Sequence, residues 1–146
     1  MTQPAYSVDV SADGLSFEFD SVGPAGIFRK IVVYSQIPDA VDVYNLGFGD
    51  LNEQGFIDDT VVTNNGDRNT VLATVVSTVF VFLDTFPNRR VFFKGSTDVR
   101  TQLYQRIIRT NQKTVDDLFV FRGFVEQHWE SFQDGADYEP FLIQRI

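Results

Sequence analysis

The chain has 146 residues, enough for one domain that buries roughly 68–70% of the surface of its extended form. Hydrophobic residues make up 43% and aromatic residues 14% of the chain, which excludes an intrinsically disordered protein. There is no cysteine and one histidine, His128, so disulfides, thiolate zinc sites and cysteine nucleophiles are excluded. We expect a single domain over residues 1–146 that needs no cofactor and works in the cytoplasm.

The net charge of −8 is distributed unevenly along the chain. Residues 1–73 carry eleven acidic and three basic residues, whereas the window from Arg89 to Lys113 carries seven basic residues and one acidic residue. An acidic protein repels a polyanion at long range, so duplex nucleic acid is not an expected partner. The acidic half suits a basic protein partner. The basic window is compatible with binding of a small anionic ligand.

The first part of the chain predicts consecutive antiparallel strands. Asp13-Gly14 is a typical hairpin turn, and after it apolar and polar residues alternate, which indicates a strand with one face on a core. Short turns between consecutive strands make them antiparallel. The strands are expected at 15–20, 28–34 and 41–48, with a loop at 23–26 and a turn at 37–39.

A helix of about 18 residues is predicted after the turn residues Asn64-Asn65-Gly66-Asp67, which also supply helix N-cap candidates. Apolar residues recur at spacings of three and four from Leu72 to Phe86, and Pro87 ends the pattern. The most apolar run, Val71 to Leu83, is shorter than the roughly 20 residues that a membrane-spanning helix needs. We therefore expect a buried helix and no membrane contact.

The second half predicts a second helix and further strands. The strands are expected at 90–93, 119–125 and 138–146, and the helix at 98–110. His128 and Trp129 are placed in a surface turn, and Phe141 to Ile146 could form an exposed edge strand. The predicted fold class is α+β, with a mainly antiparallel, roughly six-stranded sheet and two main helices packed on it.

The two predicted helix starts form the candidate binding site. Helix N-termini offer unpaired N–H groups to anions, and arginine adds bidentate hydrogen bonds. Asp67 could act as a base and Tyr104 as an orienting hydroxyl, whereas the alternative is that these residues are simply caps and turns. No metal site is expected, because Asp50, Asp58, Asp59 and Asp67 lack calcium-loop spacing. The candidate ligand-binding residues are Asn64, Asn65, Asp67, Arg68, Lys94, Ser96, Thr97, Arg100 and Tyr104.

Four segments in order carry a resemblance to a known family: 44–50 (YNLGFGD), 62–75, 94–104 and 138–142 (YEPFL). Taken together they resemble an uncharacterised family of small bacterial proteins, a domain of unknown function found mostly in Bacteroidetes. The resemblance spans nearly the whole chain. It implies a bacterial, cytoplasmic, single-domain protein and singles out the same candidate residues without implying a reaction.

Three functions follow from these features, and the sequence leaves open whether the protein is an enzyme. The first is a binding or interaction module, such as one half of a regulatory or toxin–antitoxin-like pair. The second is an enzyme or sensor that binds a phosphate or nucleotide at the paired helix starts. The third is a structural role as a homodimer that pairs through the edge strand at Phe141 to Ile146.

Overall fold

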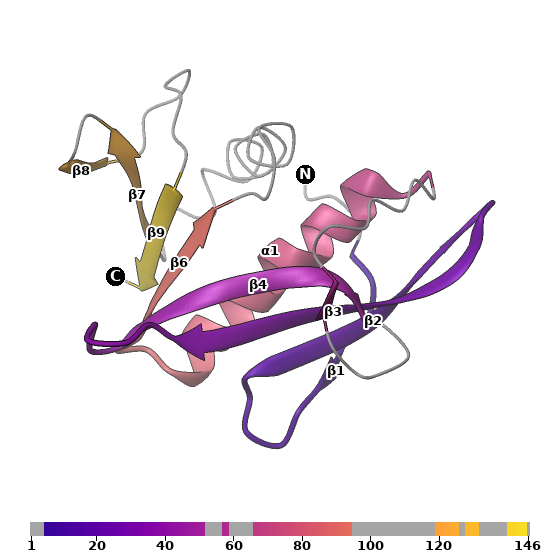
Figure 1. The fold of residues 1–146 in the computed structure, drawn as a ribbon, viewed down its shortest axis with the longest axis horizontal. Helices are drawn as coiled ribbons and strands as arrows, with labels where there is room; N and C mark the ends of the chain where they lie inside the picture. Colours follow the sequence, from indigo (N-terminus) through magenta and orange to yellow (C-terminus); the bar gives the residue numbers. More distant parts are fainter. Residues whose placement is uncertain are drawn as a thin grey trace.

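The computed structural model describes residues 5–51, 57–58, 66–94, 119–125, 128–131 and 140–145. Within these residues the chain forms one mixed sheet and a single long helix (Figure 1). In chain order the elements are β1 (Asp9–Val10), β2 (Ser16–Gly23), β3 (Gly26–Gln36), β4 (Val43–Leu51), β5 (Ile57–Asp58), α1 (Arg68–Thr85), β6 (Arg90–Lys94), β7 (Phe119–Val125), β8 (His128–Ser131) and β9 (Pro140–Arg145).

The sheet has nine strands in the order β1-β2-β3-β4-β6-β9-β7-β8, with β5 paired to β4. All neighbours are antiparallel except β4 and β6, which run parallel from Val43↔Arg90 to Asn45↔Phe92. Parallel strands need a crossover, and α1 lies in the connection between these two. The predicted fold, a mainly antiparallel, roughly six-stranded sheet with two main helices, is therefore corrected: the sheet is mixed and has nine strands, and the described residues form one helix. The second predicted helix, at 98–110, lies outside the described residues.

The three long strands β2, β3 and β4 confirm the predicted antiparallel series. The predicted loop at 23–26 is tighter than expected, because Gly23 and Gly26 pair directly around the two-residue turn Pro24-Ala25. Gly26 has φ +123°, a backbone conformation that side chains rarely adopt, so glycine suits this hairpin end. The turn between β3 and β4 holds Asp39 and Asp42 at positive φ.

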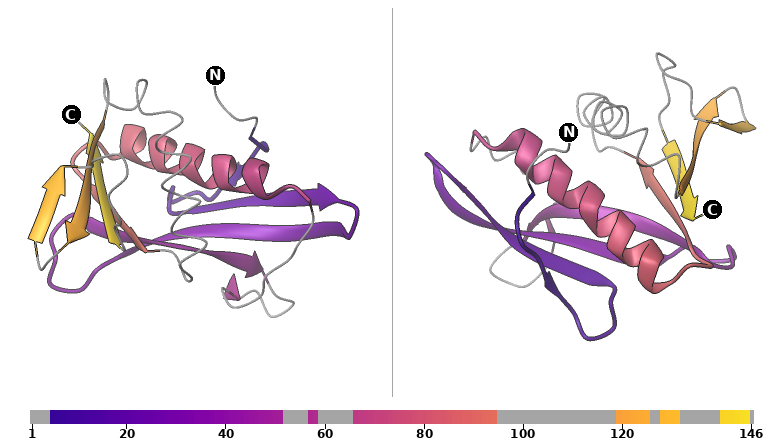
Figure 2. Two further views of the ribbon diagram at one scale, coloured as in Figure 1. Left: turned by 90° about the horizontal axis from the view of Figure 1, so that it is seen from above. Right: turned by 180° about the vertical axis from the view of Figure 1, so that it is seen from behind.

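Helix α1 has the 18 residues that the sequence predicts and ends at the C-cap Phe86, directly before Pro87. It lies along one face of the long strands, here called the inner face (Figure 2). Phe17 and Phe19 of β2, Tyr34 of β3 and Phe48 of β4 point to this face and are buried.

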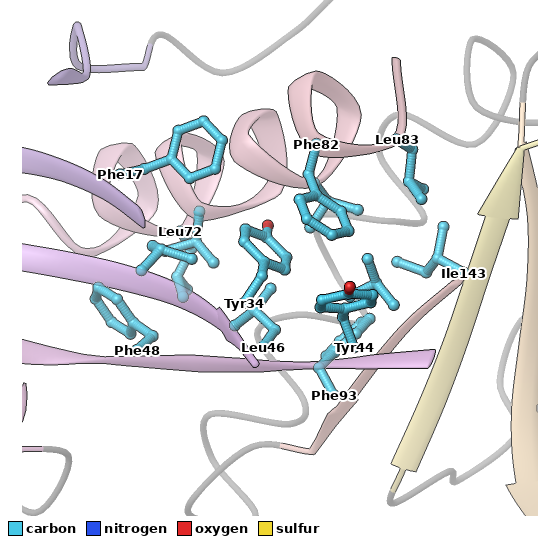
Figure 3. Packing of buried hydrophobic residues seen from close by; sticks show 14 of the residues in the cluster. Phe17, Tyr34, Tyr44, Leu46, Phe48, Leu72, Phe82, Leu83, Phe93 and Ile143 are labelled. Atoms are coloured by element: carbon cyan, nitrogen blue, oxygen red, sulfur yellow. The ribbon is translucent and has the colours of Figure 1, made fainter. Parts of the chain in front are cut away.

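The Tyr34 ring stacks on the helix residue Phe82 with 4.2 Å between centroids (Figure 3). The Tyr34 hydroxyl lies 2.9 Å from the Thr78 hydroxyl, so the polar tip of this buried ring is also satisfied. The apolar pattern read from the sequence therefore found the core.

Two predictions for the C-terminal part are wrong. His128 and Trp129 lie in β8, paired to Val125 and Phe124, and not in a turn. The strand at the C-terminus, β9, lies between β6 and β7 and is not an edge strand, so it cannot pair across a dimer as expected. In the described part of the chain, no helix is both long and apolar enough to cross a membrane.

Candidate functional site

The structure tests only part of the candidate site. Asn64, Asn65, Ser96, Thr97, Arg100 and Tyr104 lie outside the described residues. Arg68 begins α1 and Lys94 ends β6. The convergence of two helix starts therefore remains a prediction, and Asp67 is the candidate whose side chain can be described.

Asp67 occupies the N-cap position of α1, but its side chain makes no capping hydrogen bond. Its carbonyl accepts the first helical hydrogen bond from the Val71 amide at 2.9 Å. Its carboxylate instead accepts hydrogen bonds from the hydroxyls of Tyr6 at 2.6 Å and of Ser21 at 2.5 Å. Asp67 therefore lies at the N-cap position, within the segment that the sequence offered as N-cap candidates, but its side chain does not cap the helix. A carboxylate at this helix start also repels an anion, which disfavours the α1 half of the phosphate site.

Tyr6 and Ser21 are the partners that sequence reasoning missed. They lie 61 and 46 positions from Asp67 along the chain, and no local pattern links them to it. Ser21 is fully buried on the inner face of β2, so its hydroxyl needs an internal acceptor. The sequence did hold one signal: Ser21 follows Phe17 and Phe19 at the next inward position of an alternating strand, so a polar residue stands where an apolar one is expected.

Tyr6 joins the N-terminal segment to α1 and to β2. Its amide donates to the Thr74 hydroxyl at 2.9 Å, and its ring stacks on Phe19 with centroids 5.8 Å apart. Its hydroxyl also lies 3.2 Å from both the amide and the carbonyl of Val22. The single hydroxyl proton goes to the nearer Asp67, so the hydroxyl accepts from the Val22 amide. Burial, followed by the hydrogen bond to Asp67, raises the pKa of Tyr6, and the Val22 backbone contact opposes this.

The two basic residues of β3 are both engaged within the molecule. Lys30 points to the inner face and forms an ion pair with Asp50, its cross-strand neighbour on β4. The Lys30 side chain is only 7% exposed. A buried charge is retained only when it is paired, so this lysine serves the fold and is not available to a ligand.

Arg29 points to the opposite face of the sheet, the outer face, and contacts three carboxylates. Its guanidinium lies 2.7 Å from Asp9, 3.2 Å from Glu18 and 3.2 Å from Asp20. These contacts, the hydrogen bond to Asp9 foremost, raise the pKa of Arg29 above its already high ordinary value, although burial opposes the shift. Three carboxylates around one guanidinium leave an excess of two negative charges on this part of the outer face.

Exposed apolar side chains lie beside this acidic cluster. Val22 and Ile27 are cross-strand partners near the end of the β2–β3 hairpin, and they are 55% and 69% exposed. Both positions alternate with the buried ones, so they lie on the outer face with Arg29. The hairpin projects from the sheet at the right of Figure 1. An acidic patch with an exposed apolar pair is therefore presented at one end of the protein.

The edge of β2 beside this patch is partly open. The Ser11 amide donates to the Ser16 carbonyl at 2.9 Å, so the backbone of Ser16 points to the edge occupied by β1. Backbone groups alternate along a strand, so those of Glu18, Asp20 and Val22 point to the same edge. β1 pairs only as far as Glu18. Among the described residues, the backbone of Asp20 has no strand partner on that edge.

The other end of α1 shows a different chemistry. The Arg89 guanidinium lies over the rings of Phe86 at 3.7 Å, Tyr44 at 4.4 Å and Phe82 at 5.7 Å from their centroids. Its Nη1 atom is buried and makes no hydrogen bond to any residue that the structure describes. Arg89, the first arginine of the basic window, is therefore used in cation–π packing, and its guanidinium is not free to bind an anion.

These features define the class: a small domain with a mixed sheet, a helix on the inner face, and an acidic outer face beside the part of β2 that β1 leaves unpaired. The chain belongs to a family of unknown function, DUF6934, whose model matches residues 2–146. This confirms the resemblance to an uncharacterised family that the ordered motifs indicated. Searches of curated proteins and of solved structures found no match.

Proposed function

We propose that the protein is a binding module that recognises a basic partner protein through the outer face of β1, β2 and β3. One observation carries the proposal. The two basic residues within residues 5–51, Arg29 and Lys30, are both held in internal ion pairs. The excess charge on the surface of this part of the protein is therefore negative.

The charge and the apolar residues supply different parts of binding. An excess of negative charge steers a basic partner toward the face and raises its association rate. The exposed pair Val22 and Ile27 then offers apolar area that a partner can cover, which lowers the dissociation rate. One member of a regulatory or toxin–antitoxin-like pair is the narrower form of the proposal. A chain without cysteine fits the reducing cytoplasm as its setting.

A peptide-display selection against the full-length protein tests this function. Random peptides of about seven residues have the length of one strand. We expect selected peptides to carry a net positive charge. Their binding should weaken strongly when the salt concentration rises from about 0.05 to about 0.5 M, because salt screens exposed charges. Recovery of no peptide above background, or of peptides without charge preference and without salt dependence, would overturn the proposed function.

A pair of charge-neutralising variants refines the test. Asp20→Asn removes a carboxylate from the patch, and Asp39→Asn removes one from the β3–β4 turn, outside the patch. Both change the net charge by the same amount, and asparagine tolerates the positive φ of position 39. We expect only Asp20→Asn to weaken a selected basic peptide substantially. Equal effects would show that overall charge, and not the outer face of β2, attracts the peptide.

A further inference from the structure

We propose that the basic partner binds as an added strand on the open edge of β2 at Asp20 and Val22, and that Tyr6 competes for this edge. The inference rests on the proposed function and names its binding mode. Strand addition uses main-chain hydrogen bonds for affinity and alternate side chains for specificity.

The backbone of β2 is built to accept one more strand. β1 has only two residues and covers β2 as far as Glu18. The chain before β1 leaves the sheet, because the Tyr6 amide donates to Thr74 on α1 and not to β2. The edge-facing amide and carbonyl of Asp20 are therefore available within the described part of the chain, and those of Val22 meet only the Tyr6 hydroxyl.

The side chains beside this edge select a basic occupant. A strand added to β2 would place alternate side chains on the outer face, next to Asp20 and Glu18. Lysine or arginine at those positions would pair with carboxylates that the single Arg29 only partly neutralises. A second copy of the same edge would instead bring the acidic clusters of the two copies close together, which costs free energy. Charge complementarity therefore favours a basic partner segment over a homodimer.

Tyr6 acts on the same edge from the inner face. Its hydroxyl accepts a hydrogen bond from the Val22 amide at 3.2 Å while it donates to Asp67 at 2.6 Å. An incoming strand needs that amide, so it must displace the hydroxyl. Tyr6→Phe removes the competitor but keeps the ring that stacks on Phe19. Mutation of a residue with a purely structural role would weaken peptide binding, whereas mutation of a residue that competes with the peptide strengthens it.

The experiment measures binding of one selected basic peptide to the full-length protein and three variants by fluorescence anisotropy. Tyr6→Phe should bind roughly two- to tenfold more tightly, the range expected for one freed backbone hydrogen bond. Asp20→Pro removes the edge-facing amide and should bind at least roughly tenfold more weakly, since it loses a hydrogen bond and a charge. Asp20→Asn is the matched control, because it loses the charge and keeps the amide, and its loss should be smaller.

Folding of each variant is checked by thermal unfolding. A second measurement, on the unmodified protein, tests strand addition even if the Asp20→Pro variant does not fold. In the unmodified protein, hydrogen exchange of the Asp20 and Val22 amides should slow when the peptide binds, because strand addition protects edge amides. The amides of Lys30 to Val33, the part of β3 that has a strand on both sides, serve as the internal control.

The outcomes separate the two proposals. Strand addition is wrong if basic peptides bind but Tyr6→Phe lowers their affinity. It is also wrong if they bind and the Asp20 and Val22 amides stay unprotected. In both cases the proposed recognition of a basic partner by the acidic outer face stands. If no basic peptide binds, the proposed function itself is wrong. If the protein alone sediments as a dimer with protected Asp20 and Val22 amides, a second copy occupies the edge and the basic-partner inference is overturned.

Discussion

The two ends of α1 are held to the sheet by different physical means. At the N-terminal end, the Asp67 carboxylate binds the hydroxyls of Tyr6 and Ser21. At the C-terminal end, the Phe82 ring packs on Tyr34 and is fully buried. The first arrangement depends on hydrogen-bond direction and on the negative charge of the carboxylate. The second, whose rings Figure 3 shows, depends on contact area.

This difference teaches where the protein can tolerate change. Hydrogen bonds between buried groups contribute modestly while they are complete, and their loss leaves unsatisfied polar atoms. Aromatic packing contributes in proportion to the area removed from water, so it is large and less sensitive to small shifts. We expect the C-terminal end to dominate the free energy of unfolding, and the N-terminal end to control how the N-terminal segment and β2 are held.

The largest predicted effect comes from Phe82→Ala. This substitution removes a fully buried ring that contacts Tyr34, Tyr44 and Phe86. The free energy of unfolding should fall by about 3–5 kcal/mol, measured by urea denaturation. Val81→Ala, one position away and 43% exposed, is the control and should change it by less than about 1 kcal/mol. Similar losses for both variants would contradict the packing described here.

The next effect comes from Asp67→Ala, which removes the carboxylate that accepts from the Ser21 hydroxyl and is the nearer acceptor of the Tyr6 hydroxyl. Since Ser21 is fully buried, we expect a loss of about 1–3 kcal/mol in urea denaturation. In a Ser21→Ala background the same Asp67→Ala change should cost less, because the hydrogen bond between these two side chains is already absent. Strict additivity of the two substitutions would show that these groups do not interact in solution.

A smaller effect is expected from alkaline pH through Tyr6. The folded state raises the pKa of this phenol above its unfolded value of about 10, so its stabilising contribution is complete below that pH. The contribution declines as pH rises through the folded pKa. The stability difference between the unmodified protein and Tyr6→Phe should therefore shrink from about pH 9 to about pH 11. A constant difference over that range would show that the hydroxyl does not carry the shift.

The smallest effect is predicted for the ion pair between Asp84, near the end of α1, and Arg145 of β9. Asp84 is exposed, so water screens the interaction. Asp84→Ala should lower the free energy of unfolding by about 0–1 kcal/mol, and added salt should remove the difference. A loss as large as that of Asp67→Ala would mean that this exposed pair contributes as much as the buried hydrogen bonds.

The sequence by itself determined the local structure of the described part. The alternation in 15–20 and 28–34 marked β2 and β3, and the spacing of apolar residues before Pro87 marked all of α1. These predictions succeed because the period of side-chain direction, two for strands and 3.6 for helices, is written directly into the order of apolar residues. The strand predicted at 119–125 coincides with β7.

Only the tertiary structure decided which strands are neighbours and what the polar residues bind. The parallel pair of β4 and β6, the interior place of β9 and the contacts of Asp67 all join residues far apart in the chain. Apolar periodicity gives the face on which a residue lies, but not the partner across the sheet. A cap was one of the roles that the sequence left open for Asp67, because a local pattern indicates only local hydrogen bonds, whereas its hydroxyl donors, Tyr6 and Ser21, lie far away in the chain.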